Sequence, residues 1–180
     1  MIETERLCLR RWRDADVAPF AALNADQNAM RFMPGTMTAD ETRAMVGRIR
    51  DHFDAHGFGL WAVEAPGVAP FIGYVGLQRP AFDAHFTPCV EIGWRLAPAY
   101  WGKGYATEAA MAALRFGLKD LNLDQIVSFT VLANKPSWSV MERIGMTRDP
   151  AEDFDHPRLA EGHPLRRHVL YRANRPGLRG

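Results

Sequence analysis

One stretch, residues 89–108, constrains the fold of this chain more than any other, because it holds three patterns in succession. Its first half alternates between apolar and other residues, which is typical of a strand with one apolar face. The two faces hold Val90, Ile92, Trp94 and Leu96 on one side, and Glu91, Gly93 and Arg95 on the other. Pro98 ends the strand, and a turn with Gly102 and Gly104 follows. From Tyr105 the apolar residues recur at spacings of three and four, which predicts an amphipathic helix.

A helix that begins at a glycine turn suits an anion. Its first backbone N–H groups have no partner inside the helix, and the positive end of the helix dipole lies there. Glycines also let a phosphate group come close to the backbone without meeting a Cβ atom. The stretch therefore predicts a phosphate site, although a tight turn without any ligand stays open on the glycine spacing alone.

Two well-known phosphate motifs fit this turn poorly. The P-loop pattern G-x-x-x-x-G-K-[ST] needs a glycine where Ala97 stands and a hydroxyl where Gly104 stands. The dinucleotide pattern G-x-G-x-x-G lacks its third glycine, since Thr107 occupies that position, although Asp124 lies where the ribose-binding acid is expected. The turn also follows a predicted antiparallel meander rather than a first parallel strand.

The rest of the chain predicts further strands and helices in the order β-α-α-β-β-β-α-β-α-β. Strands are expected at 6–12, 58–64, 71–78, 124–132 and 166–172, a loop at 148–164, and a frayed tail at 174–180. Asp14 or Asp16 can cap the first helix, and Thr38 with Glu41 fits a capping box for the second, which should end at Gly57. Pro136 fits the first turn of the last helix.

This order predicts one α+β (mixed α/β) domain over residues 1–180. A right-handed crossover through the helix after the glycine turn makes strands 89–96 and 124–132 parallel, inside a sheet that is otherwise mostly antiparallel. Such a mixed sheet can splay between its two parallel strands, and ligands favour such places at strand ends. We expect helices on both faces of the sheet.

Composition excludes several classes of protein. The net charge of +1 gives no basic bias for nucleic acid. The first residues hold charges instead of an apolar core of a signal peptide, and no stretch is apolar enough for a membrane span.

Cys8 and Cys89 lack a paired spacing and are expected to be free buried thiols. His52 and His56 lack a third metal ligand and fit a solvated helix end. We therefore expect a soluble, cytoplasmic protein without a metal.

The glycine turn and two other segments resemble one family. EIGWRLAPAYWGKGYATEA resembles motif A of the GCN5-related N-acetyltransferases (GNAT family), whose loop pattern is Q/R-x-x-G-x-G/A, with Trp101 replacing Gln or Arg. This variant, the opening TERLCLRRW and the later ANKPSWSVMERIGM resemble the RimJ/RimL-like branch, which acetylates ribosomal-protein N-termini. The resemblance spans Thr4 to about Tyr171. It implies the GNAT fold, coenzyme A as cofactor with acetyl-CoA as acyl donor, and an amine acceptor.

The resemblance also implies a cofactor site. Backbone N–H groups of the turn would bind the pyrophosphate of coenzyme A, with a hydroxyl beside them, and the strand end and the segment after strand 124–132 would contact the pantetheine arm. The residues are Trp101, Gly102, Lys103, Gly104, Tyr105 and Ala106 with the Thr107 hydroxyl for the pyrophosphate, and Leu96, Ala97, Asn134 and Ser137 for the arm. The Lys103 side chain could contact phosphate or be solvated.

Acyl transfer from a thioester to an amine needs a neutral amine, so a base or a water relay helps near neutral pH. Glu91 is the candidate base; a solvated strand face or an ion pair with Arg95 are the alternatives. Ser137 is the candidate acid for the leaving thiolate, with a local helix cap as the alternative. Many family members have a tyrosine four residues after this serine, but here Met141 stands there and is expected in the core.

The acceptor is less constrained. Loop 82–86 and segment 153–163 could line its pocket, and the acids Glu152, Asp153 and Asp155 could attract an amine or be solvated. We expect direct transfer in a ternary complex to a primary amine, above all the α-amino group of a protein or peptide. A small amine, such as an amino acid or an antibiotic, a non-catalytic acyl-CoA-binding module, and a homodimer stay open.

Overall fold

A computed structural model describes residues 1–175 of this protein. Its sheet has the strand order β1-β2-β3-β4-β5-β6-β9-β7, with β8 paired to β9. All neighbouring strands pair antiparallel except β5 and β6, which are parallel. The strands are β1 (Ile2–Glu3), β2 (Cys8–Arg10), β3 (Leu60–Ala65), β4 (Ala69–Gln78), β5 (Glu91–Leu96), β6 (Gln125–Val131), β7 (Thr147–Arg148), β8 (Phe154–Asp155) and β9 (Arg167–Asn174). The predicted mixed, mostly antiparallel sheet is confirmed.

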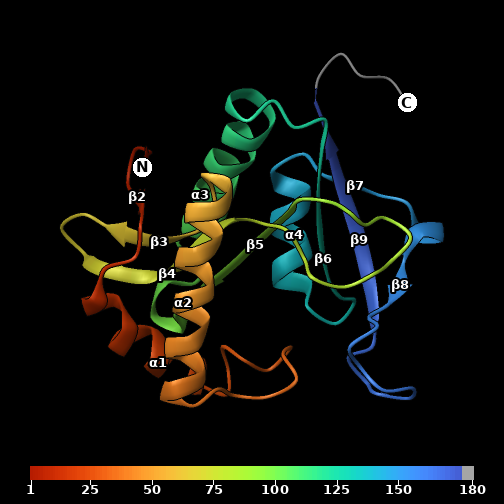
Figure 1. The fold of residues 1–180 in the computed structure, drawn as a ribbon, viewed down its shortest axis with the longest axis horizontal. Helices are drawn as coiled ribbons and strands as arrows, with labels where there is room; N and C mark the ends of the chain where they lie inside the picture. The colour runs from red at the N-terminus through yellow and green to blue at the C-terminus, as the bar shows by residue number, and fades with distance from the viewer. Residues whose placement is uncertain (176–180) are drawn as a thin grey trace.

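Helices cover both faces of this sheet, as predicted. They are α1 (Val17–Ala25), α2 (Ala39–His56), α3 (Tyr105–Arg115), which continues into a π-helical turn (Phe116–Asp120), and α4 (Lys135–Arg143). Short 3₁₀ turns lie at Asp14–Asp16, Pro98–Tyr100 and Pro150–Glu152. Helix α2 crosses in front of the sheet in Figure 1, and α3 lies behind it.

The local helix signals largely hold. The hydroxyl of Thr38 accepts a hydrogen bond from the amide of Glu41 at 3.2 Å, and the Glu41 carboxylate accepts the amide of Thr38 at 2.7 Å, so the predicted capping box is confirmed. The helix ends at Gly57 with φ of 76°, a left-handed conformation that suits glycine. The expected aspartate cap is found one turn earlier: no side chain caps α1 itself, but the Asp16 carboxylate accepts the Arg13 amide at 2.7 Å at the start of the 3₁₀ turn that leads into α1. Asp16 also lies buried against Arg10, with 2.7 Å between Oδ2 and Nη1, because a buried guanidinium needs a counter-charge.

The C-terminal third holds more structure than the sequence indicates. The expected loop 148–164 contains the last residue of β7, a 3₁₀ turn and β8. These strands have two residues each, too short for any period to show, and they form because β9 offers a pairing edge. The expected frayed tail is wrong for Asn174, which ends β9, and residues 176–180 lie outside the described part of the chain.

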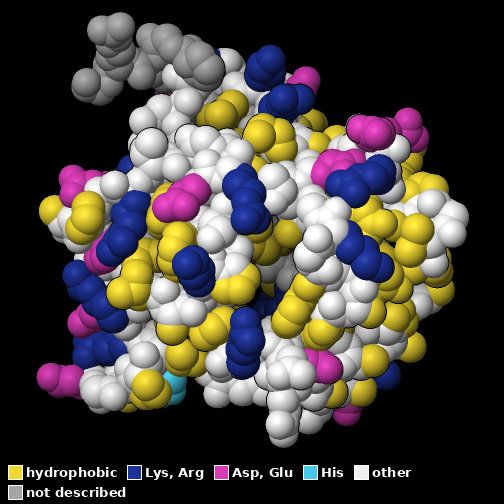
Figure 2. Space-filling model, turned by 180° about the vertical axis from the view of Figure 1, so that it is seen from behind, with side chains coloured by type: hydrophobic (Ala, Val, Ile, Leu, Met, Phe, Trp, Pro, Cys, Tyr) yellow, Lys and Arg dark blue, Asp and Glu magenta, His cyan; other side chains and the backbone are white. Residues whose placement is uncertain are grey.

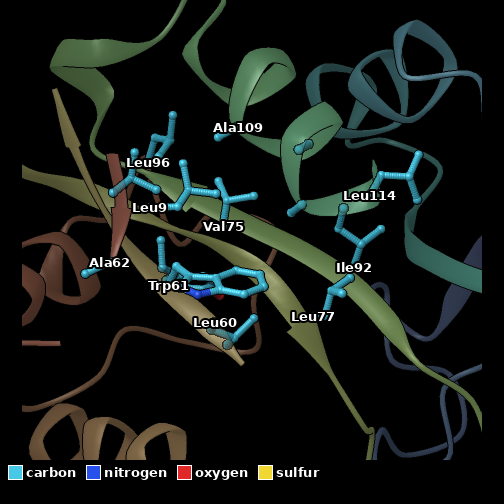
Figure 3. Packing of buried hydrophobic residues seen from close by; sticks show 14 of the residues in the cluster. Leu9, Leu60, Trp61, Ala62, Val75, Leu77, Ile92, Leu96, Ala109 and Leu114 are labelled. Atoms are coloured by element: carbon cyan, nitrogen blue, oxygen red, sulfur yellow. The ribbon is translucent and has the colours of Figure 1, made fainter. Parts of the chain in front are cut away.

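The main core packs the sheet against α3 and also against α1 and α2. Figure 3 shows its α3 side, where Leu9 of β2, Val75 of β4, and Ile92 and Leu96 of β5 lie near Ala109 of α3. All five are at most 4% exposed. A second, smaller cluster lies between β6, β9 and the two segments at 82–89 and 154: Phe86, Val127, Phe154 and Leu170, with Phe82, Ala84, Cys89 and Phe129 packed against it.

The splay between the parallel strands is present. β5 and β6 share a single register pair, Glu91 with Val127, next to a 2.9 Å hydrogen bond from the Val127 amide to the Val90 carbonyl. Beyond it, the hydroxyl of Ser128 donates to the Ile92 carbonyl at 2.9 Å, and no further register pair joins the two strands. The two strands therefore part after Ile92 and Ser128, toward their carboxyl ends, as the predicted splay requires.

Candidate active site

The glycine turn has the geometry of an anion site. Gly102 and Gly104 have φ of 72° and 79°, and Gly104 is the N-cap residue of α3. The first intrahelical hydrogen bond runs from the Glu108 amide to the Gly104 carbonyl at 3.0 Å, so the amides of residues 104–107 have no partner within the helix. The amide of Trp101 is already donated to Pro98 at 3.1 Å. The turn thus offers several neighbouring backbone N–H donors, which begin after Trp101.

The surface around the turn fits an anionic group. A Cβ atom at Gly102 would have no heavy atom within 4 Å, so a ligand can reach the backbone there. Lys103 is exposed, with Nζ 5.6 Å from the ring of Tyr100, and Arg31 lies 5.9 Å from the ring of Trp101. Figure 2, which views the molecule from the side opposite α2, shows Lys and Arg side chains around a hollow near the middle of that face.

Trp101, the position that departs from the family pattern, ties the turn to the strand before it. Its indole N–H donates to the Leu96 carbonyl at 2.7 Å. Ala97 is also held by the protein, because its amide donates to Ile72 at 2.9 Å and its carbonyl accepts the amide of Tyr100 at 2.9 Å. At the end of β5, backbone groups that the family resemblance assigns to the cofactor are thus partly occupied by bonds within the protein.

Thr4 and Arg6 of the N-terminal segment form a brace against Glu108 and the glycine turn, which the sequence does not predict. Arg6 contacts Glu108 of α3 through Nε to Oε2 at 2.6 Å and through its amide to Oε1 at 2.9 Å, and its Nη1 donates to the Lys103 carbonyl at 3.0 Å. The Thr4 hydroxyl also donates to Glu108, at 2.6 Å. Despite some burial, these donors lower the pKa of the Glu108 carboxyl. The sequence signal for this contact is that Arg6 and Glu108, which have opposite charges, each lie in a segment that resembles a family motif.

The brace leads to a first prediction. Arg6→Ala should weaken acetyl-CoA binding about 3–10-fold and lower the free energy of unfolding by about 1 kcal/mol, because it removes charged hydrogen bonds that fix Lys103. Calorimetry and thermal denaturation measure the two effects. Arg11→Ala, which breaks an exposed pair with Asp54, is the matched control and should change neither quantity noticeably. Equal cofactor affinity in both variants would show that the brace does not hold the turn.

Glu91 is the most perturbed carboxylate near the splay. It is half-buried, and the side-chain amide of Gln78 donates to its Oε2 at 2.9 Å. Burial raises the pKa of Glu91 to about 7, and the hydrogen bond from Gln78 opposes that rise. The alternative of an ion pair with Arg95 is wrong, since Arg95 donates instead to the Oδ1 atom of Asn24 at 2.6 Å. A carboxylate with such a pKa can accept a proton near neutral pH.

Asn134 and Ser137 lie where β6 passes into α4. Asn134 is the N-cap residue of α4; its side chain donates to Thr130 at 3.0 Å, and its carbonyl accepts the amide of Ser137 at 3.1 Å. Ser137 is half-buried, and α4 has no side-chain cap hydrogen bond, which removes the local-cap alternative. Met141, where many relatives have a tyrosine, is 1% exposed and lies in the core as expected.

The two segments proposed for the acceptor pocket meet each other. The ring of Phe82 lies 4.7 Å from His156, and Phe86 lies 4.7 Å from Phe154. Each of the neighbouring acids is paired with an arginine, and Asp155 is also exposed to solvent. The pairs are Glu152 with Arg172, Asp153 with Arg148, and Asp155 with Arg167. The arginines come from β7 and β9, which the sequence does not place near these acids.

Both cysteines are free, but they are half-buried rather than buried as expected. Burial and the nearby Glu91 raise the pKa of the Cys89 thiol to about 11, so it holds its proton and is a poor nucleophile at neutral pH. Within residues 1–175 no group of three or more His, Cys, Asp or Glu could hold a metal ion. None of the helices in that range has the length and apolar character to cross a membrane.

Comparisons with known proteins point to one family. The family model described as "Acetyltransferase (GNAT) domain" matches residues 6–147. The uncharacterized N-acetyltransferase YnaD of Bacillus subtilis is 33% identical over 149 residues, covering 82% of this chain and 83% of YnaD. A GNAT-family acetyltransferase structure from Bacillus anthracis has a TM-score of 0.80 and 29% identity, covering 97% and 98% of the two chains. The spermidine N-acetyltransferase of Vibrio cholerae, solved with CoA and spermine, shares the fold, with a TM-score of 0.73 and 20% identity over 96% and 97% of the chains.

Proposed function

The chain belongs to the acetyltransferase (GNAT) domain family and is an N-acetyltransferase, and we propose that it transfers acetyl from acetyl-CoA to the α-amino group of a protein or peptide. The single observation that carries transfer to an amine is the Glu91 carboxylate: half-buried, with a pKa raised to about 7, beside the point where β5 and β6 part. A base at that position can serve an amine that reaches the splay.

The residues around the turn suit coenzyme A. The amides of residues 102–107 would hold the pyrophosphate, with the Thr107 hydroxyl and the Lys103 ammonium beside them. Ala97 is a poor partner for the pantetheine arm because both of its backbone groups bond within the protein. Hydrogen-bonding direction alternates along a strand, so we expect the arm to pair with Trp94 and the Leu96 amide instead. When bound, acetyl-CoA supplies the activated acyl group.

The protein's own groups then account for the transfer. Glu91 in its ionised form accepts a proton from the incoming ammonium, directly or through a water molecule, so that the neutral amine can attack. Backbone N–H groups that point into the splay can stabilise the developing charge on the carbonyl oxygen. The raised pKa of the Cys89 thiol makes it a poor acyl carrier, which favours direct attack in a ternary complex over a covalent acyl-enzyme.

Ser137 is proposed to hydrogen-bond the leaving sulfur. A thiol has an ordinary pKa of about 8.5, so a proton donor helps the leaving group only modestly. Ser137→Ala should therefore lower kcat about 3–30-fold with little change in acetyl-CoA affinity. Steady-state kinetics together with calorimetry check this, and Ser139→Ala on the same helix is the control. A loss of cofactor affinity with unchanged kcat would instead assign Ser137 to binding.

The protein or peptide acceptor rests on the resemblance of three motifs to the RimJ/RimL-like branch, and a cytoplasmic location and ribosomal proteins as partners go with it. A small amine is the second candidate, since solved structures with this fold include both a spermidine N-acetyltransferase and a ribosomal-protein acetyltransferase. A screen of peptides and small amines with acetyl-CoA, read by mass spectrometry, decides between them. Calorimetry accompanies it: an absence of acetyl-CoA binding at millimolar concentration would refute the function, and tight binding without any turnover would favour a binding module.

A further inference from the structure

Gly93 lies in the middle of β5, and neither its backbone nor its neighbours require a glycine there. Its φ lies outside the left-handed region. A Cβ atom added to it would meet one heavy atom within 4 Å, the Oε1 atom of Glu91 at 3.8 Å. Gly76, its partner on β4, is different, because a Cβ there would lie 2.2 Å from the Gly59 carbonyl oxygen. Glycine weakens a strand, and one without a packing reason often marks a place where a ligand comes close.

The open surface over Gly93 has a charged group at each end. Glu91 and Arg95 lie on the same face of β5 as Gly93, because side chains alternate along a strand. The carboxylate of Glu91 leans toward Gly93, as the 3.8 Å distance shows. A molecule on this surface would thus have a carboxylate at one end and a guanidinium at the other.

Buried polar groups hold Arg95 in position. Its Nη1 donates to Asn24, which is 0% exposed and whose side-chain amide donates to the equally buried Thr42 at 3.1 Å. The ring of Tyr74, on the neighbouring strand, lies 5.5 Å from the Arg95 guanidinium carbon. These contacts fix the side chain from α1, α2 and β4.

Arg95 nevertheless lacks a counter-charge in the described part of the chain. No carboxylate within residues 1–175 forms a salt bridge with it, whereas the half-buried Arg148 and Arg172 each pair with an acid. A guanidinium has five N–H donors, and the hydrogen bond to Asn24 uses one of them. Asn24 is neutral, so it orients the guanidinium without neutralising it.

We propose that Gly93 is the floor of the acceptor site and that Arg95 binds a carboxylate which the acceptor carries beyond its amine. The amine lies at Glu91, so this inference rests on the proposed function. Four residue steps of a strand span about 13 Å between Cα atoms, and the Glu91 side chain, which leans toward Gly93, shortens that gap. A peptide advances about 3.5 Å per residue, so an acidic side chain at its second or third position reaches Arg95. The acceptor class is therefore an acidic peptide N-terminus, and a polyamine is disfavoured by charge repulsion.

Peptides that differ in one residue test the role of Arg95. The native enzyme should acetylate a peptide with Glu at position two or three at least about 10-fold more efficiently, by kcat/KM, than the same peptide with Lys. Arg95→Gln should lower kcat/KM for the Glu peptide about 10–100-fold, change the Lys peptide little, and leave acetyl-CoA affinity unchanged. Arg11→Gln, at an exposed arginine, is the control. An unchanged preference in Arg95→Gln would overturn the inference.

Gly93→Val tests the floor. The substitution favours a strand and meets open space, so the melting temperature and acetyl-CoA affinity should be kept while kcat/KM for every peptide falls at least about 10-fold. Gly93→Ala, with a single added methyl group, should give a smaller fall and covers the case in which valine disturbs folding. Native kcat/KM in Gly93→Ala and Gly93→Val would refute the floor.

The two levels of proposal fail differently. If acetyl-CoA does not bind, or if it binds and no amine is acetylated, the proposed function fails and this inference with it. If peptides are acetylated but the Glu and Lys forms react equally, the inference alone is wrong. Preferred acetylation of spermidine over the acidic peptide would also refute it while keeping the acetyltransferase activity.

Discussion

Glu91→Gln should lower kcat/KM about 10²–10⁴-fold at pH 8, the range in which a positioned general base contributes to catalysis. The substitution keeps the shape of the side chain and an oxygen that can accept the hydrogen bond from Gln78, so it removes the base with little change in packing. Steady-state kinetics over a range of acceptor concentrations, at saturating acetyl-CoA, measure the effect. Asp51→Asn, at an exposed position of α2, is the control for loss of a carboxylate.

The pH dependence gives this prediction a second readout. Only the ionised carboxylate accepts a proton, so the native kcat/KM should rise with pH up to about 7 and then lose its dependence on this group. The Gln variant should lack that step. A variant that keeps both the step near pH 7 and the native rate would remove Glu91 from the mechanism and leave the base to another group or to solvent.

The same substitution should stabilise the fold, which separates a catalytic from a structural role. In the folded protein the pKa of Glu91 is raised from 4.5 to about 7. Below pH 4.5 the carboxyl is protonated in both the folded and the unfolded state, so its burial costs no ionisation energy. Between pH 4.5 and about 7 the unfolded state loses this proton first, so the free energy of unfolding falls as the pH rises. Above pH 7 Glu91→Gln should therefore raise the free energy of unfolding by about 1–3 kcal/mol. Urea denaturation at pH 5 and pH 8 checks this; a loss of stability at pH 8 would contradict the assignment.

Gly104→Val should lower acetyl-CoA affinity at least about 10–100-fold. A β-branched residue strongly disfavours the φ of 79° at this N-cap, so the turn must change and its amides lose their common direction. The new Cβ would also lie 3.3 Å from the Nη2 atom of Arg6. Calorimetry on the folded variant measures the affinity.

The control must share the backbone strain, and the chain offers one. Gly67, in the turn between β3 and β4, has φ of 76° and open space around its Cβ position. Gly67→Val should cost similar stability but keep the cofactor affinity. If both variants bind acetyl-CoA equally well, the turn at Gly104 is not the phosphate site.

The features that the sequence predicts correctly are local. The alternation in 90–96, the glycine turn and the Thr38–Glu41 capping box each depend on residues a few positions apart, and the structure contains all three. The splay followed from the order of elements, since a crossover helix makes its flanking strands parallel. Family motifs then supplied the chemistry that the glycine spacing left open.

The features that the sequence does not predict are contacts between distant segments. Arg6 meets Glu108 across 102 positions, and Arg95 meets Asn24 across 71. No period or cap marks such pairs, because tertiary packing selects which charges meet. The Asp16 carboxylate shows the same limit: the sequence marks it as a cap but does not predict its buried ion pair with Arg10. The alternation of residues in β5 likewise does not predict the burial that raises the pKa of Glu91.

The brace between Arg6 and Glu108 has a practical consequence for work with this protein. The segment that precedes Leu7 lies beside the glycine turn, with Thr4 and Arg6 both bonded to Glu108. A purification tag joined to Met1, or proteolysis that removes the first six residues, therefore acts within a few residues of the turn. Measured acetyl-CoA affinities should depend on how the N-terminus was prepared, so binding data from tagged and tag-free protein are not interchangeable.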